Sequence, residues 1–236
     1  MIVDVKKRPK IKNIVLKPQA KNDTVNDIIE KNKTKLFRHL LKTPKANEVH
    51  VHSLSMIYEP LMILSGTYNA DFLRKATHEL SVEHNVKEIV FGDGIFPSSN
   101  FTLSNKLVTK MKKNTVRMEL EEHVFVAKEK EIVLDNHGEL RDFTYKVDTK
   151  DVENYPNAVL KKNIVREFEI TEETAIKKLA KLLQSHDTFE EVRDINESLV
   201  VDEITKIYVP IYEARLVGPK KKVKILRYDA VKKKRV

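Results

Sequence analysis

The sequence predicts an α+β protein built from two related strand–helix–strands units with mostly antiparallel sheets and a β-hairpin insertion between them. The first observation is a repeat at an offset of 150 residues, because Ile57-Tyr58-Glu59-Pro60 recurs as Ile207-Tyr208-Val209-Pro210. At the same offset, Lys12-Asn13-Ile14-Val15 recurs as Lys162-Asn163-Ile164-Val165. The second observation is that an alternating stretch precedes a helical one in each copy. A fixed offset indicates an internal duplication.

Chance similarity is the alternative explanation for this repeat. The apolar stripes of the two expected helices agree only in part at the offset of 150. After the two prolines the register would have to drift, since Gly66 would need to match Gly218. Duplication is the simpler interpretation, and it defines the domains expected below.

In the first copy, a strand over residues 11–17 is expected to end at Pro18. Apolar residues then recur at helical spacing from Thr24, and Pro44 ends that helix. Residues 48–58 alternate as a strand, and Pro60 is expected to interrupt it because proline cannot donate to a sheet ladder. Further extended segments are expected at 61–68, 78–82 and 86–91, before the turn Gly92-Asp93-Gly94.

The second copy repeats this order. Residues 164–170 alternate as a strand, and a helix is expected to start at Thr171-Glu172-Glu173, where acidic residues suit its positive end. Residues 200–217 form extended chain, Gly218-Pro219 makes a turn, and a last strand covers 223–231.

The region between the copies has β character of its own. Alternation and a turn at residues 135–138 predict a hairpin or three-stranded meander over 115–147. The expected domains are therefore a basic arm (1–10), a first α+β unit (11–94), a β-rich insertion and linker (95–160), and a second α+β unit with a basic C-terminal tail (161–236).

Composition limits the class of protein. The 236 residues are 41% hydrophobic and 33% charged, with no cysteine and no run of 18 apolar residues. Such a chain can bury a substantial core, and it is expected to have no membrane partner. The N-terminus lacks the apolar segment of a secretory signal, so a cytoplasmic location is expected. Without cysteine, disulfides and thiolate metal sites are excluded.

The net charge of +9 is concentrated at the two ends of the chain. Residues 1–21 carry a net +6, residues 215–236 carry +9, and the remainder carries −6. Because chain termini often lie close together at the surface, the two ends are expected to merge into one basic patch. Phosphate groups are the natural partners of such a patch. A solvated turn and a frayed tail are the alternative interpretation.

The candidate nucleic-acid-binding residues are the cations of both ends and two tyrosines. Tyr208 and Tyr212 share a strand face near Lys206 and could stack on exposed bases, although a position in the core is the commoner fate of such residues. The full set is Lys6, Lys7, Arg8, Lys10, Lys220, Lys221, Lys222, Lys224, Lys232, Lys233, Lys234, Arg235, Tyr208 and Tyr212.

The sequence gives little support for a catalytic or metal-binding function. His50 and His52 share a strand face but lack a recognisable third ligand, so no metal site is expected. Scattered acids near Asp142 and Asp148 could serve a hydrolase, but such acids are normally solvated. No dinucleotide or phosphate-binding loop motif is present. No cofactor is expected, and the lack of a recognisable catalytic motif favours a protein that is not an enzyme.

The sequence thus predicts a non-enzymatic nucleic-acid-binding protein that contacts phosphates through its basic termini and a hairpin tip at residues 218–224. The alternative is a protein-interaction or assembly module that uses the groove between the repeats or an exposed strand edge. The sequence does not distinguish DNA from RNA, and it leaves the oligomeric state open.

Overall fold

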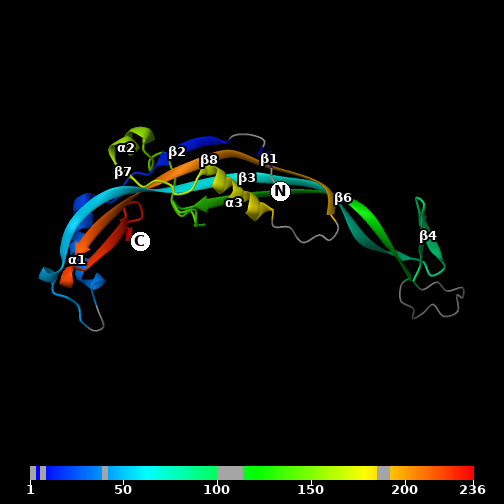
Figure 1. Ribbon diagram of the computed structural model, residues 1–236, viewed down its shortest axis with the longest axis horizontal. Helices are drawn as coiled ribbons and strands as arrows, with labels where there is room; N and C mark the ends of the chain where they lie inside the picture. Colours follow the sequence, from blue (N-terminus) through cyan, green and yellow to red (C-terminus); the bar gives the residue numbers. More distant parts are fainter. Residues whose placement is uncertain (1–3, 6–8, 39–41, 100–113, 185–191) are drawn as a thin grey trace. The chain divides into compact units, whose positions relative to one another are not determined.

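A computed structural model describes residues 4–5, 9–38, 42–99, 114–184 and 192–236 (Figure 1). The described chain is a mostly antiparallel sheet with three helices, which confirms the expected α+β class. The helices are α1 (Asn22–Leu36), α2 (Pro156–Lys162) and α3 (Glu172–Leu183). The strands are β1 (Asp4–Val5), β2 (Lys10–Val15), β3 (His50–Val82), β4 (Glu88–Phe91), β5 (Gly94–Pro97), β6 (Asn114–Leu134), β7 (Ile164–Val165), β8 (Val192–Val217), β9 (Val223–Asp229) and β10 (Lys234–Arg235).

The strands of the main sheet follow the order β10-β9-β8-β3-β6, and β4 and β5 form a separate two-stranded hairpin. Two short strands add parallel pairings, β2 with β8 and β7 with β3. The chain divides into two compact units. Unit 1 comprises Met1–Asp4, Tyr68–Lys128 and Gln184–Ser198, and unit 2 comprises Val5–Thr67, Glu129–Leu183 and Leu199–Val236.

The long strands differ from the sequence expectation. We expected Pro60 to interrupt the chain, but β3 continues through it for 33 residues. Proline removes one ladder donor but keeps an extended backbone, and the hydrophobic alternation does not change phase there. Every second residue from Tyr58 to Phe72 is buried, Pro60 included. β6 likewise runs unbroken over residues 114–134, where two strands of a meander were expected.

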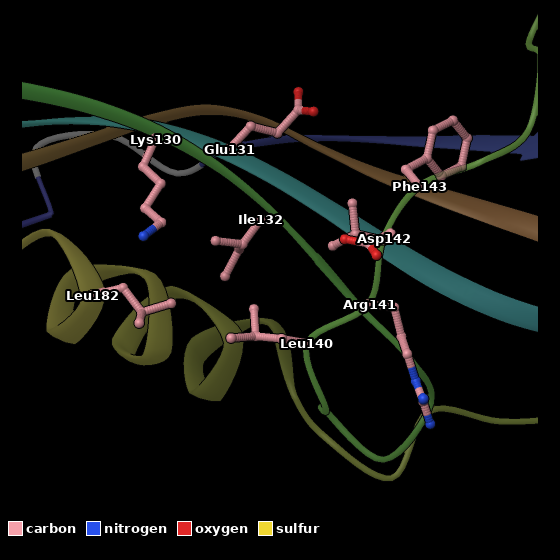
Figure 2. Close-up of a pocket in the computed structure, with 9 residues that line it drawn as sticks. Lys130, Glu131, Ile132, Leu140, Arg141, Asp142, Phe143 and Leu182 are labelled. Carbon is pink, nitrogen blue, oxygen red and sulfur yellow. The ribbon is translucent and has the colours of Figure 1, made fainter.

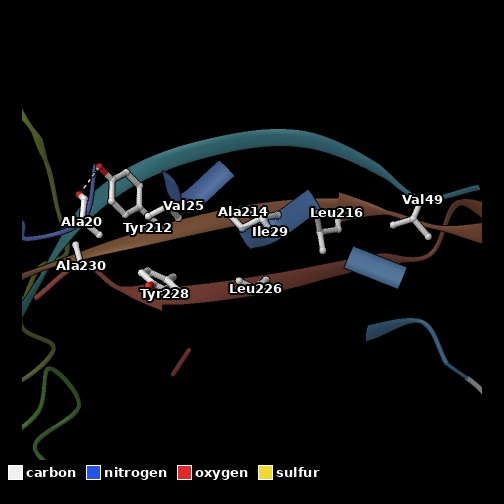
Figure 3. Packing of buried hydrophobic residues seen from close by; sticks show 10 residues of the cluster. All are labelled: Ala20, Val25, Ile29, Val49, Tyr212, Ala214, Leu216, Leu226, Tyr228 and Ala230. Carbon is white, nitrogen blue, oxygen red and sulfur yellow. Dashed lines mark hydrogen bonds between the residues drawn. The ribbon is translucent and has the colours of Figure 1, made fainter. Parts of the chain in front are cut away.

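One face of the sheet in unit 2 is covered by α1. Val25 and Ile29, four residues apart and therefore on one side of the helix, are fully buried. They pack with Tyr212, Ala214 and Leu216 of β8 and with apolar residues of β9, as Figure 3 shows. The small side chain of Ala214 leaves room for the helix to approach the strand.

The opposite face of β8 is covered by irregular chain from the region after β6. Ile207, Val209 and Ile211 alternate with the α1-facing residues, so they point to the other side of the sheet. Phe143 and Tyr145 pack against them. Beyond the bridge between Leu134 and Leu140, residues 141–147 form no strand.

The helix α3 approaches β3 closely. Leu179 is fully buried, and its Cδ2 lies 3.0 Å from where a Cβ on Gly66 would be. The carbonyl of Val200 lies 3.1 Å from the same point. A side chain at residue 66 would therefore push the helix and the neighbouring strand away.

Several structural features of unit 2 occur twice, at positions 150 residues apart in the sequence. α1 begins at residue 22 and α3 at residue 172. β2 aligns Ile14 with Ile207, and β7 aligns Ile164 with Ile57. Each short strand thus pairs with the long strand that lies in the other half of the sequence, in the same register.

Unit 1 consists of parts of the long strands with the β4–β5 hairpin. Ion pairs link β3 with β6 through Arg74 and Glu122 at 2.7 Å, and β8 with β6 through Arg193 and Glu121 at 2.5 Å. The buried Asn114 donates to the carbonyls of Glu83 and Val86 at the base of the hairpin. Among the described residues, no helix is long and apolar enough to cross a membrane.

Candidate nucleic-acid interface

The basic character of the sequence belongs to unit 2. Its segments contain 34 Lys and Arg against 21 Asp and Glu, a net charge of +13. The segments of unit 1 contain 10 and 14, a net charge of −4. The positive net charge of the chain is therefore carried by unit 2.

Within unit 2, the described basic segments lie along one edge of β8. Because β3 occupies one side of β8, both β2 and β9 pair with the other side, β2 along residues 203–208 and β9 along residues 211–217. Lys10 lies opposite Glu203, and the β8–β9 turn follows Val217. These positions are 14 residues apart on β8, or roughly 46 Å at ~3.3 Å per residue.

We call this row of exposed cations the basic edge. Strands β2, β9 and β10 and the β8–β9 turn place its members, and none forms an ion pair with another residue that the structure describes. The basic edge consists of Lys10, Lys12, Lys220, Lys221, Lys222, Lys233, Lys234 and Arg235.

The β8–β9 turn presents three of these lysines at the end of α1. Gly218 donates to the Lys222 carbonyl at 2.8 Å, which closes the turn. The ring of Phe37, just after α1, packs so closely on Gly218 that any Cβ there would force the ring to move. Lys220 and Lys221 adopt positive φ angles of 58° and 57°. The packed glycine thus fixes a turn whose lysines are all exposed.

Lys224, a candidate phosphate contact, is exposed and also bonds to the end of α1. Its Nζ donates to the carbonyl of Leu36 at 2.6 Å and lies 5.6 Å from the centre of the Phe37 ring. This carbonyl belongs to the last turn of α1, where a cation suits the negative end of the helix dipole. Lys224 therefore anchors the helix end to β9.

The C-terminal tail is held against β9 rather than free. Lys234 and Arg235 pair with Asp229 and Tyr228, and the amide of Val236 donates to the Arg227 carbonyl at 3.1 Å. Lys232 lies 3.9 Å from the centre of the Tyr145 ring and donates to Thr144.

The anchor of this tail is Asp229, whose side chain is fully buried. Its carboxylate accepts from the Tyr145 hydroxyl at 2.7 Å and from the amides of Val231 and Lys232 at 2.9 Å and 2.8 Å. Burial, followed by the bond to Asp229, raises the pKa of Tyr145 above its ordinary value. The tail cations are therefore presented by ordered backbone.

The described cations of the two basic ends lie at separate places along β8 and β9. Lys10 is exposed at the start of β2, and Lys6, Lys7 and Arg8 lie outside the described residues. Along β8, the partner of Lys10 and the partner of Asp229 are eight residues apart, or roughly 26 Å. The turn and the tail lie at the two ends of β9, roughly 20 Å apart.

The two candidate tyrosines differ in their surroundings. Tyr212 is 7% exposed within the α1 cluster, and its hydroxyl donates to the Ala20 carbonyl at 3.4 Å. Tyr208 is half-buried opposite Val15 of β2, and burial raises the pKa of both phenols. Lys206, expected beside them, donates to Glu172 of α3 at 2.5 Å. Tyr212 thus takes the core position that is common for tyrosines, and Tyr208 is partly accessible.

One exposed aromatic residue near the basic edge was not predicted from the sequence. Tyr155 is 76% exposed at the start of α2, which packs against β2. Lys161 and Lys162 of the same helix are exposed as well. The local signal was slight, because Asn154 and Pro156 mark this stretch only as a linker.

An open depression of about 590 Å³ lies between β6 and α3 (Figure 2). Ile132, Leu140 and Leu182 point toward one another across it, while Arg141 points away and pairs with Asp135 at 2.9 Å. The described residues contain no cluster of three or more His, Asp or Glu that could hold a metal ion. The depression is lined by both apolar and charged side chains, the latter being Lys130, Glu131, Arg141 and Asp142.

Comparison of the chain with family models, with curated proteins and with solved structures finds no match.

Proposed function

We propose that this protein binds nucleic acid, contacting phosphates through the basic edge. The observation that carries the proposal is the alignment of basic segments from opposite ends of the sequence along one edge of β8. The members of the basic edge are exposed and are not neutralised by acids among the described residues. Because ordered backbone carries these cations, binding of phosphate need not order the backbone of these segments as well.

The spacing of the cations suits a phosphate backbone. One strand of B-form DNA advances about 3.4 Å per phosphate, so roughly 46 Å of strand edge corresponds to about 13 nucleotides. The turn and the tail, roughly 20 Å apart, would contact phosphates about six nucleotides apart. Cations of this kind position a nucleic acid without reading its sequence, so the proposed binding is non-specific.

The test is binding across a salt series. Affinity of the full chain for labelled 30-nucleotide DNA and RNA is measured by fluorescence anisotropy, and log K is plotted against log salt. Replacing Lys220, Lys221 and Lys222 by Gln should weaken binding and reduce the slope by about 2 to 3, since each phosphate contact contributes about 0.7 to 0.9.

The matched control changes the same charge elsewhere in unit 2. Lys31→Gln, Lys177→Gln and Lys181→Gln alter exposed residues of α1 and α3 that are not members of the basic edge. This variant should keep most of the affinity and the slope. An equal loss in both variants, or no binding of the natural chain at low salt, overturns the proposal.

We also infer that the two halves of the chain, 11–94 and 161–236, arose by duplication, with 95–160 inserted between them. The recurring helix starts, strand registers and hydrogen bonds at an offset of 150 support this inference. The same offset also applies after the two prolines, where the sequence alone suggested a shift that would match Gly66 to Gly218. Gly66 contacts α3, and Leu216, 150 positions later, packs in the α1 cluster. Gly66 therefore corresponds to Leu216, and no shift is needed.

A second candidate function, binding of a protein partner, is favoured by the β4–β5 hairpin of unit 1. Val90, Phe91 and Ile95 are 64% or 65% exposed beside its Gly92-Asp93 turn. Exposed apolar clusters of this kind often mark interaction sites. If this function applies, a complex isolated with the protein should resist high salt and be lost in Phe91→Asp. Such a complex should tolerate the neutralised Lys220–Lys222 variant.

A further inference from the structure

We propose that Tyr155 is a base-stacking residue and that the β2 end of the basic edge therefore takes single-stranded nucleic acid. This inference rests on the proposed function and adds to it the kind of strand that is bound. Tyr155 differs from the other six tyrosines of the chain, which are all buried or half-buried. At 76%, it is also the most exposed large hydrophobic side chain in the described part of the molecule.

The segment leading to Tyr155 lies along β2. The amide of Lys17 donates to the Asp151 carbonyl at 2.9 Å, and the amide of Glu153 donates to the Val15 carbonyl at 2.8 Å. Together with the antiparallel bridge between Leu16 and Val152, these bonds show that the segment runs antiparallel to β2. It lies along the edge of β2 that faces away from β8.

Beyond this bridge the same segment stays close to β2. The side-chain amide of Asn13 donates to the side-chain carbonyl of Asn157 at 3.4 Å. This bond places the first turn of α2, which follows Tyr155, beside Asn13, one residue from the exposed Lys12.

The backbone of Tyr155 is fixed although its ring is exposed. Its carbonyl accepts from the amides of Ala158 and Val159 at 3.1 Å and 3.2 Å. Tyr155 stands directly before Pro156, at the N-cap of α2, with φ −125° and ψ 68°. These bonds hold the backbone that carries the ring against the first turn of the helix.

Exposed cations lie on the two elements next to Tyr155, β2 and α2. Lys10 and Lys12 come from β2, and Lys162 lies seven residues after Tyr155, which is two helical turns and nearly the same side of α2. None of the three forms an ion pair with a described residue. Two acids are nearby, Glu203 opposite Lys10 and Glu153 before Tyr155, and Glu203 accepts a hydrogen bond from Thr205 at 2.8 Å.

An aromatic ring among lysines matches the chemistry of a single strand. The lysines contact phosphates, and the ring stacks on a base whose face is free. In a duplex the base faces are covered by neighbouring pairs, so the ring has nothing to stack on without unstacking them. Stacking should contribute about 5- to 100-fold in affinity for a single strand and little for a duplex.

The experiment compares a labelled 20-nucleotide oligothymidine with a labelled 20-base-pair duplex at one fixed low salt concentration. Tyr155→Ala should lose about 5- to 100-fold affinity for oligothymidine and less than about 2-fold for the duplex. Tyr155→Phe keeps the aromatic face and should bind both as the natural chain does. Because the side chain is exposed, circular dichroism and thermal unfolding should be unchanged in both variants.

The possible outcomes separate the two proposals. If the natural chain binds neither probe, the proposed nucleic-acid function fails, and this inference fails with it. If the natural chain binds but Tyr155→Ala weakens both probes equally or neither, the stacking role is overturned while the basic edge stands. The neutralised Lys220–Lys222 variant serves as reference, since it should weaken both probes together.

Discussion

The backbone amide of Arg166 donates to the carbonyl of Tyr58 at 2.9 Å, and an equivalent bond joins Leu16 to Tyr208 at 3.0 Å. Both the donors and the acceptors are 150 residues apart. The first bond holds the chain just after β7 against β3, and the second holds the chain just after β2 against β8. Each long strand is therefore bonded to a short segment that lies more than 100 residues away in the sequence.

Equivalent helix residues should contribute similarly to stability. Ile29 and Leu179 are both fully buried, 150 positions apart, in α1 and α3. Ile29→Ala and Leu179→Ala should each lower the free energy of unfolding by about 2–5 kcal/mol, because each leaves a cavity. Urea denaturation measures the change. Lys31→Ala and Lys181→Ala, at exposed positions of the same helices, should stay within about 0.5 kcal/mol. A loss below 1 kcal/mol at either buried site contradicts the expectation.

Gly218 should tolerate no side chain, although its φ of −112° suits any residue. The obstacle is the ring of Phe37, which occupies the place of a Cβ. Gly218→Ala should therefore cost about 1–3 kcal/mol through overpacking. In a double-mutant cycle, Phe37→Ala should remove most of that extra cost because it clears the space. Additive losses would show that the glycine is needed for another reason.

Tyr145→Phe should destabilise unit 2. The substitution removes the hydroxyl that donates to Asp229, whose side chain is fully buried and would keep only its backbone donors. A buried carboxylate that loses one donor should cost about 1–3 kcal/mol, measured by chemical denaturation at pH 7. Tyr155→Phe makes the same chemical change at an exposed ring and should leave the free energy of unfolding unchanged. Equal stability of the two variants would contradict the anchoring role of Asp229.

The ion pair between Glu172 and Lys206 should make stability depend on acid pH. The hydrogen bond from Lys206 holds the pKa of Glu172 below its usual value of 4.5. A carboxyl whose pKa is lowered by folding contributes stability above its unfolded pKa, and this contribution is lost as pH falls through the folded pKa. The natural chain should therefore be more stable than Glu172→Gln near neutral pH, and the difference should shrink below about pH 4.5.

The control for this pH experiment lies in the same helical turn. Glu173 is exposed in the first turn of α3, where both glutamates interact with the helix dipole. Glu173→Gln therefore reports the dipole effect without the contact to Lys206. If the two variants lose the same stability at every pH, the ion pair contributes nothing measurable.

The sequence carried much of the local information. Helical spacing from Thr24 and from Glu172 predicted α1 and α3, and α1 ends before the expected stop at Pro44. The turns at Gly92 and Gly218 were predicted from glycine, and both lie between paired strands. These features follow from residues close together in the chain, whose side-chain period and backbone preference act locally.

The extents of the strands were not predictable in the same way. Pro60 resembles an interruption, yet β3 passes through it, because strand length is set by the neighbours that supply hydrogen bonds and cover both faces. The same reason explains β6, where a predicted meander is one strand. Two candidate site residues show the same limit of the sequence. No local pattern indicates that Lys224 donates to the carbonyl of Leu36, or that Tyr212 donates to the carbonyl of Ala20.

By itself, the sequence determined the α+β class, the positions of α1 and α3, the basic ends and the two tetrapeptide matches at an offset of 150, because periodicity, charge and identity are properties of the chain. It did not predict α2, which lies in a stretch expected to be a linker. Only the tertiary structure decided that β2 pairs with β8 and β7 with β3, and that Lys10 and the C-terminal tail lie along the same edge. It also decided which tyrosine is exposed. Burial and pairing depend on residues more than 100 positions away, and no local pattern specifies which distant segment will cover a given face.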